Sequence, residues 1–377
     1  MCFPCLLLQD LRDIPDIVKK GMWFFVDDLD SGYWHLAVKP EHRTFLGIHV
    51  VEEDNTVSFY VWRVMFLGVS DAVFIFTALL KPVRSYTASL GVPNLMYLDD
   101  NLTGGATKEI ACSNNEISND VLKKAGWIVS MEKKKGPAQR ILFLGLEVCS
   151  ITMKFFIPEK KLIRLLALFD SLLSSKKVQL RKLASCLGLL QSCGKALGPV
   201  VRLMTRRAYI FLMHNVDRHC WNFYMALSKD VIEDILFWQK NLVDLNGFKF
   251  SASLSMIDIH HEVIADASNI GLFGFAFFSS RYEIILRRML TAREVKKSST
   301  HRELLAIHEI YTGVKAQQFA NSTVRHLCDN KAVSEIMDHG SSVPELQALA
   351  VSIFLSCRRL NITLYVEWRR RDDPLSG

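Results

Sequence analysis

Two neighbouring carboxylates, Asp99 and Asp100, stand in the stretch "LMYLDDNLTGG" (residues 95–105), between an apolar run and a glycine-rich segment expected to be a turn. Two like charges at the end of a buried strand repel each other unless a cation holds them. An Asp-Asp pair that opens a turn is also ordinary turn chemistry, so this motif alone leaves both interpretations open. The rest of the chain has to decide between them.

A third carboxylate lies at the end of another expected strand. Asp28 closes the strand-like "FFVDD", and two adjacent strands that end together would bring Asp28, Asp99 and Asp100 within reach of one or two divalent ions. Such a cluster binds a nucleoside triphosphate through Mg²⁺ and promotes in-line displacement at phosphorus. One ion activates the attacking oxygen and the other stabilises the leaving group.

A second set of acids occurs in the last third of the chain. Asp266 ends "VIAD", Glu303 falls in the first turn of an expected helix, and Asp329 ends "VRHLCD". Each acid alone is more simply read as a solvated loop residue. Because the acids stand at matching element ends in both halves, the pattern favours a second carboxylate site for two metal ions.

The elements that must position these acids change in character along the chain. Residues 23–105 predict strands and short helices, with "HLAVKP" strand-like and "LMYLDD" a short buried strand. A helix that ends at Gly126, a basic turn over 131–140 and one strand, "ILFLGLEV", follow. Residues 158–245 carry long helical patterns, and from about residue 260 strands alternate with helices, as in an α/β domain with a mixed sheet.

Composition allows two or three domains and favours a polyanionic partner. The chain has 377 residues, half of them hydrophobic, and a net charge of +7, with basic clusters at 131–140, 202–209 and 368–371. A solvated basic face would look the same. The nine cysteines show no zinc spacing, which favours reduced thiols of an intracellular protein. No apolar run reaches ~18 residues and no signal peptide is visible, so no membrane is expected as a partner.

A resemblance to a known protein family accounts for these observations together. The chain resembles the reverse transcriptase and ribonuclease H region of a retrotransposon Pol polyprotein, of the gypsy-like or DIRS-like kind. The similar stretches occur in the family's order and cover nearly the whole chain. They are "DLDSGYWHLAVKPEHRTFLGI", "MFLGVSDAVFIFTALLKPV", "YLDD", "EKKKGPAQRILFLGLEV", "LRKLASCLGLLQSCGKALGPVVRLMTRRAY", "DILFWQKNLVDLNG", "IADASNIGLFGFAF", "SSTHRELLAIHEI", "CDNKAV" and "VEWRRRDDPLS".

The resemblance implies an α/β (α+β) fold in three domains. Residues 1–150 would form a polymerase palm with an antiparallel sheet, helices and incomplete fingers. Residues 151–255 would form a helical thumb and connection, and residues 256–377 a ribonuclease H-like domain with a mixed sheet. The implied function is RNA-directed DNA polymerase activity with hydrolysis of the RNA strand. Its partners would be an RNA template, a DNA primer, the RNA–DNA hybrid and dNTPs.

The resemblance also implies roles for single residues. In the polymerase part, Asp28, Asp99 and Asp100 would be catalytic and bind metal, with the Leu29 carbonyl as a further ligand. Nucleotide and primer–template contacts would come from Tyr33, Gly68, Ser70, Lys133, Leu144 and Gly145. Without the resemblance, Tyr33 is equally well a core tyrosine. Asp266, Glu303 and Asp329 would bind metal in the ribonuclease H-like part. Each site would take two Mg²⁺ or Mn²⁺ ions.

The chain also departs from the family's pattern. Relative to that pattern it starts after the segment that grips the triphosphate, and the fourth ribonuclease H acid would fall at or beyond Gly377. The first departure predicts truncated fingers. An alternative function therefore stays open, that of a truncated, catalytically weak or inactive retroelement-derived protein that binds nucleic acid. A different two-metal phosphotransferase or nuclease explains fewer of the motifs.

Overall fold

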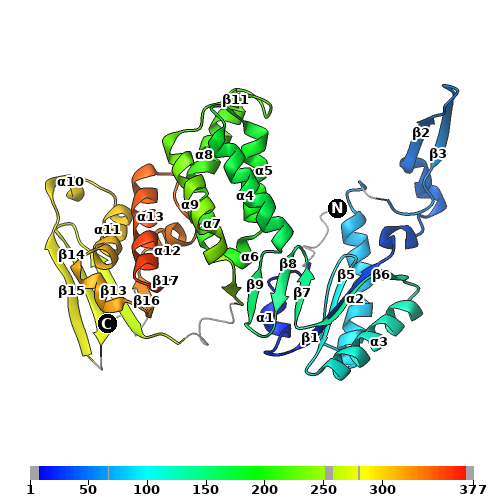
Figure 1. Ribbon diagram of the computed structural model, residues 1–377, viewed down its shortest axis with the longest axis horizontal. Coiled ribbons are helices and arrows are strands. Elements are labelled where there is room, and N and C mark those ends of the chain that lie inside the picture. The colour runs from blue at the N-terminus through cyan, green and yellow to red at the C-terminus, as the bar shows by residue number, and fades with distance from the viewer. Residues whose placement is uncertain (1–7, 67, 251–257, 279–280, 371–377) are drawn as a thin grey trace. The chain divides into compact units, whose positions relative to one another are not determined.

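The computed structural model describes residues 8–66, 68–250, 258–278 and 281–370. The chain divides into two compact units. Among the described residues, the first unit comprises residues 8–158 and 246–250, and the second comprises residues 159–245 and 258–370 (Figure 1). No helix in these ranges is long and apolar enough to cross a bilayer.

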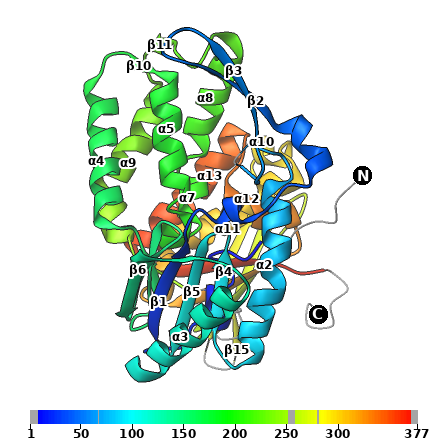
Figure 2. The same ribbon diagram turned by 90° about the vertical axis from the view of Figure 1, so that its right-hand side faces the viewer.

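The main sheet of the first unit is antiparallel and has the strand order β4-β5-β1-β6. Its strands are β4 (Asn94–Tyr97), β5 (Asp100–Gly105), β1 (Trp23–Leu29) and β6 (Val129–Ala138). Two helices pack against it, α2 (Ala72–Ser89) and α3 (Lys108–Lys124) (Figure 2). Leu29 of β1, Phe76 of α2 and Leu122 of α3 share one apolar cluster. Helix α2 ends two residues before Gly91, which has a φ of 82°.

The glycine-rich segment after Asp99 is a strand rather than the expected turn. Asp100 to Gly105 form β5, which pairs with β1 and β4 in the middle of the sheet. A side chain at Gly105 would clash with the backbone of Ala111, where α3 begins. Gly105 therefore allows α3 to lie close on β5, and close approach of another backbone is a common reason for glycine in a strand.

Three further local predictions were wrong. The basic stretch over 131–140 is mostly strand β6, an edge strand on which exposed lysines are tolerated. "HLAVKP" contains only a single bridge, Ala37 to Val64, between the 3₁₀ turns η1 (Gly32–His35) and η2 (Pro40–Leu46). "ILFLGLEV" is a hairpin of β7 (Arg140–Phe143) and β8 (Leu146–Cys149), because Leu144 and Gly145 both adopt positive φ.

The hairpin belongs to a second sheet, of order β12-β9-β8-β7. Strands β9 (Lys154–Phe156) and β12 (Phe248–Lys249) pair although they are far apart in the sequence. The side-chain oxygen of Asn246 accepts a hydrogen bond of 2.8 Å from the backbone nitrogen of Ile157. The residues directly before and after the helical segment, Ile157 and Asn246, are thus bonded to each other. A separate hairpin, β2 (Gly47–Val51) with β3 (Val57–Val61), is largely exposed.

The second unit begins with the expected helices. The longer ones are α4 (Glu159–Ser174), α5 (Leu180–Gln191), α8 (Arg206–Arg218) and α9 (Lys229–Leu245), with the short α6 (Gly194–Leu197) and α7 (Val200–Leu203). Each long helix buries one stripe, as its periodicity predicts. The Arg207 Nε atom lies 3.0 Å from Asp234, an ion pair that fixes α8 to α9.

A mixed five-stranded sheet completes this unit, with the strand order β15-β14-β13-β16-β17. The strands are β13 (His261–Ala267), β14 (Gly271–Phe278), β15 (Arg281–Met289), β16 (Thr323–Cys328) and β17 (Thr363–Trp368). Strands β13, β16 and β17 are parallel, and the other pairs are antiparallel. Helix α11 (Ser299–Thr312) packs on the sheet, and two helices, α12 (Lys331–His339) and α13 (Pro344–Arg359), lie between β16 and β17 in the sequence.

The α/β class and the mixed C-terminal sheet are confirmed. The division into three domains stays a prediction, because the helices and the mixed sheet belong to one compact unit. Gln347 of α13 shows how they are joined: its amide donates a 2.8 Å hydrogen bond to the carbonyl of Leu203 in α7.

Candidate active site

Asp28 and Asp100 lie directly opposite each other on the antiparallel strands β1 and β5. Opposed residues in such a pair have Cβ atoms about 4.5–5.5 Å apart, and like charges there destabilise the sheet. The register brings these two acids together in a different way from the one expected: Asp100 begins β5, and β5 separates β4, the strand expected to end beside Asp28, from β1. An arrangement of this kind requires a positive charge nearby.

Asp99 is held beside this pair by a tight turn. Tyr97 pairs with Asp100, so Leu98 and Asp99 form the two-residue loop between β4 and β5. Leu98 has a φ of 50°, which is uncommon for a residue other than glycine. The Asp99 carbonyl accepts a 2.9 Å hydrogen bond from the backbone nitrogen of Leu29, which ties the turn to the end of β1.

Gly32 makes room for the Asp99 side chain. A Cβ atom at Gly32 would lie 2.7 Å from the Asp99 Oδ1 atom and 2.8 Å from the ring of Phe76. The glycine of "DLDSGYW" is thus needed for space, since any side chain would displace the carboxylate.

Burial and mutual repulsion raise the pKa values of two of the acids. For Asp99 and Asp100 the first cause is burial, and the second is the negative charge of Asp28. The Asp99 Oδ1 atom is buried and has no hydrogen-bond partner among the described residues. The oxygens of Asp28, Asp99 and Asp100 do not all come within 4.8 Å of one another. The buried, unpaired oxygen of Asp99 beside two further acids nevertheless fits a divalent cation, which would supply the missing positive charge.

Lys133 is the nearest cation to this cluster. Its ammonium lies 2.6 Å from the Asp28 Oδ2 atom, and that contact is the main cause of the raised pKa of Lys133. Of the three consecutive lysines, Lys133, Lys134 and Lys135, Lys133 is the one that forms an ion pair with an acid of this cluster. Lys134 instead lies over the ring of Phe25, 4.9 Å from its centroid.

Asp27 faces away from the site. Consecutive strand residues point to opposite faces, and Asp27 is buried under α3, where Asn115 donates a hydrogen bond to it. Burial raises the pKa of Asp27, which the bond from Asn115 opposes.

The other predicted polymerase residues surround the acids less closely. Tyr33 is buried against Phe76, with ring centroids 4.6 Å apart, and burial, followed by the negative charge of Asp99, raises its pKa. Gly68, with a φ of 109°, and Ser70 are exposed on the connection into α2, and Leu67 between Phe66 and Gly68 lies outside the described residues. Leu144 and Gly145 form the β7–β8 turn in the second sheet. Their contacts with nucleotide, template or primer remain predictions.

In the second unit, Glu303 and Asp329 come together with a residue that sequence reasoning missed. Ligand atoms of Glu303, Cys328 and Asp329 all lie within 4.8 Å of one another, and among the described residues no other trio of possible metal ligands does so. Burial, followed by Asp329, raises the pKa of Glu303 to about 7. The position of Cys328 directly before Asp329 was the available signal.

Asp266 is not part of this trio. Ile264 pairs with Leu327 on the parallel strands β13 and β16, so Asp266 and Asp329 follow at the same end of neighbouring strands. The Asp266 side chain is exposed there. Glu303 lies in the second turn of α11 rather than the first, and it is buried. Asp372 and Asp373, near the expected fourth acid, lie outside the described residues.

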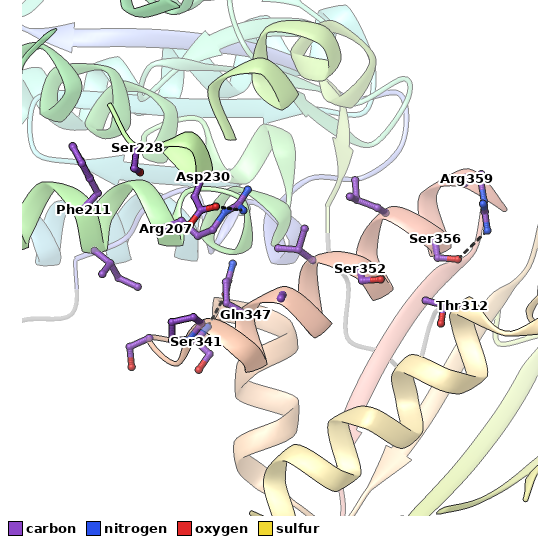
Figure 3. Close-up of a pocket in the computed structure, with 16 residues that line it drawn as sticks. Arg207, Phe211, Ser228, Asp230, Thr312, Ser341, Gln347, Ser352, Ser356 and Arg359 are labelled. Atoms are coloured by element: carbon purple, nitrogen blue, oxygen red, sulfur yellow. Dashed lines mark hydrogen bonds and ion pairs between the residues drawn. The ribbon is translucent and has the colours of Figure 1, made fainter. Parts of the chain in front are cut away.

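A cavity of about 870 Å³ lies elsewhere in the second unit, between α8 and α13 (Figure 3). Its lining runs along one face of α13 and includes Arg207, Ser352 and Arg359. None of the predicted site residues lines it, so the candidate chemistry resides in the two carboxylate clusters.

Comparisons with known proteins agree with the fold. No family model matches the chain. The genome polyprotein of Petunia vein clearing virus (isolate Shepherd) is 30% identical over 166 residues, which cover 43% of this chain and 7% of the polyprotein. The chain therefore spans a small part of that relative.

Solved structures of the foamy viral protease-reverse transcriptase are similar over 98% of this chain. The complex with RNA/DNA hybrid gives a TM-score of 0.51 at 15% identity and is covered to 47%. A dRH form in complex with double-stranded DNA gives 0.50 at 16% identity and is covered to 61%. The chain has a reverse transcriptase fold, with a palm, a helical region and a ribonuclease H-like mixed sheet. Origin from a retrotransposon remains a prediction, because these similar proteins are viral.

Proposed function

We propose that this chain is the catalytic region of an RNA-directed DNA polymerase with an associated ribonuclease H-like domain. The observation that carries the proposal is the convergence of Asp28, Asp99 and Asp100 at one end of the palm sheet, with a buried oxygen of Asp99 left unpaired. The fold supports it, because the similar foamy viral structures were solved with double-stranded DNA and with RNA/DNA hybrid.

In this proposal the three acids hold two Mg²⁺ or Mn²⁺ ions, which supply Lewis-acid activation of the attacking oxygen and stabilisation of the leaving group. The chain's own residues do the positioning. The Leu98–Asp99 turn and the Leu29–Asp99 hydrogen bond fix the carboxylates, and Gly32 leaves room for Asp99. Tyr33, packed on Phe76 behind Asp99, borders the place proposed for the sugar of the incoming dNTP.

The same proposal assigns hydrolysis of the RNA strand in a hybrid to the second carboxylate cluster. Glu303 and Asp329 are already adjacent, and Asp266 stands at the same end of the neighbouring strand. The polyanionic partners fit the net charge of +7.

One experiment tests both assignments. The purified chain is given an RNA template with a DNA primer, dNTPs and Mg²⁺, and both primer extension and RNA cleavage are measured. Asp99→Asn should lower extension on the order of a hundredfold or more while RNA cleavage continues. Asp329→Asn should lower RNA cleavage while primer extension continues. Asp54→Asn, at the exposed tip of the β2–β3 hairpin, is the matched control and should change neither.

Extension by Asp99→Asn at the rate of the unaltered chain would remove the polymerase assignment. Absence of both reactions in the unaltered chain, together with salt-dependent binding of the hybrid, would favour the alternative of an inactive protein that binds nucleic acid.

A further inference from the structure

Lys133 reaches Asp28 because β6 is irregular beside it. Between the pairs Asp28–Ser130 and Val26–Lys135, β1 advances by two residues and β6 by five. The segment between Ser130 and Lys135 therefore bulges out of the regular ladder, and Lys133 lies within it. Bulges at sheet edges often redirect a side chain toward a functional site. β6 is an edge strand of this sheet.

The bulge separates the roles of the three lysines. Lys133 pairs with Asp28, and the negative charges of Asp30 and Asp99 also act on it. Lys135 acts electrostatically on Asp100. Lys134 lies over Phe25 and acts on Asp27, which faces α3 instead of the site. One lysine of three, therefore, occupies a carboxylate oxygen that the proposed function needs for a divalent ion.

We infer that Lys133 is an internal counter-cation of this site: its ammonium holds Asp28 in the absence of a divalent ion and has to leave Asp28 when the ion binds. This inference rests on the proposed function. An ammonium and a divalent ion cannot share the same carboxylate oxygen at close range, since their charges repel.

Competition at Asp28 has a measurable consequence without any reaction. Mn²⁺ binding to the full-length chain is titrated at low salt, with free Mn²⁺ followed by electron paramagnetic resonance and no nucleic acid present. Lys133→Met should bind Mn²⁺ about two- to fivefold more tightly than the unaltered chain, a modest factor because the ion pair is exposed. Lys133→Arg keeps the charge and should resemble the unaltered chain.

Lys134→Met is the matched control. It removes the same charge from the neighbouring position, but its side chain faces Phe25, so Mn²⁺ affinity should stay within experimental error of the unaltered chain. Equal gains in Lys133→Met and Lys134→Met would mean a general charge effect and would overturn the inference. No gain in Lys133→Met would overturn it as well.

The Asp28→Asn variant separates this inference from the proposed function. Asp28→Asn should remove the Mn²⁺ site whose affinity responds to Lys133, while binding at the Glu303–Asp329 cluster continues. If no Mn²⁺ site depends on Asp28, the proposed polymerase site fails. If that site exists but its Mn²⁺ affinity does not change in Lys133→Met, only the counter-cation role fails.

Discussion

Glu303 shows at the scale of one residue how burial raises the pKa of a carboxyl group. The side chain is buried beside Asp329 and accepts a 3.2 Å hydrogen bond from Ser299. Burial is the larger cause of its raised pKa, and the Asp329 charge adds to it. Protonation of Glu303 therefore stabilises the buried pair, and a divalent ion at the proposed site would take the place of this proton.

This pKa predicts a pH dependence of stability. The folded protein binds the Glu303 proton more tightly than the unfolded chain, because the pKa is about 7 against an ordinary 4.5. The stabilisation is complete below about pH 4.5 and is lost as the pH rises through about 7. Without metal, the unaltered chain should lose about 1 kcal/mol relative to Glu303→Gln between those pH values, after allowance for solvent screening.

Urea unfolding in EDTA at pH 5 and pH 7.5 measures this difference. Glu335→Gln, on the exposed side of α12, is the control and should run parallel to the unaltered chain. If the free energies of unfolding of Glu303→Gln and the unaltered chain differ by the same amount at both pH values, the raised pKa of Glu303 is contradicted.

Among single residues, the sequence predicted the acids better than their surroundings. Asp28, Asp99 and Asp100 could be named because strand ends and carboxylates are local features. The hydrogen bond between Asn115 and Asp27 joins residues 88 positions apart, and no local sequence pattern predicts it. The same applies to Gly32, whose importance depends on Asp99 and Phe76 in other elements.

At the scale of elements, hydrophobic periodicity identified the long helices and misjudged several short strands. Strand β6 carries charges on consecutive residues because it is an edge strand with an irregular segment. Strand β5 has glycine at position 105 because α3 lies against it there. In both cases the neighbour in space determines the residue type, so a turn was the reasonable prediction from sequence.

Gly105→Ala tests the close approach of α3 to β5. The added methyl group would clash with the backbone of Ala111, so strand and helix have to separate. We expect a loss of about 1–3 kcal/mol in the free energy of unfolding, measured with urea. Gly188→Ala is the matched control: it lies in α5 with open space around it and should stabilise by about 0.5–1 kcal/mol. An unchanged stability of Gly105→Ala would mean that α3 is not held in this contact.

At the scale of the whole molecule, the order of motifs predicted the architecture that composition alone could not. The resemblance spans nearly the whole chain, and the similar solved structures cover 98% of it. The resemblance did not reveal that α7 packs on α12 and α13, since these contacts join segments more than 100 residues apart. Gln347 is central to them because it is buried, donates to the Leu203 carbonyl and accepts from the Ser341 nitrogen at 2.8 Å.

Replacement of Gln347 by leucine should weaken this packing. Leu203 and Ser341 would each keep a buried backbone group without its partner, at a cost of about 1–3 kcal/mol. Hydrogen exchange should rise in α7 and around Ser341, while β13 and β14 keep their protection. Gln318→Leu, exposed in the turn after α11, is the control and should leave exchange in α7 unaltered. Unchanged exchange in Gln347→Leu would show that the helices are held together by other contacts.

The pairing of β9 with β12 has a consequence for the order in which the chain folds during synthesis. Ile157 and Asn246 are 89 residues apart and meet at the base of the helical segment. The second sheet of the first unit therefore cannot acquire its last strand until the ribosome has completed all the helices from α4 to α9. Closing a loop of this length costs entropy that grows only slowly with its size, so prior folding of those helices into a compact bundle shortens the search.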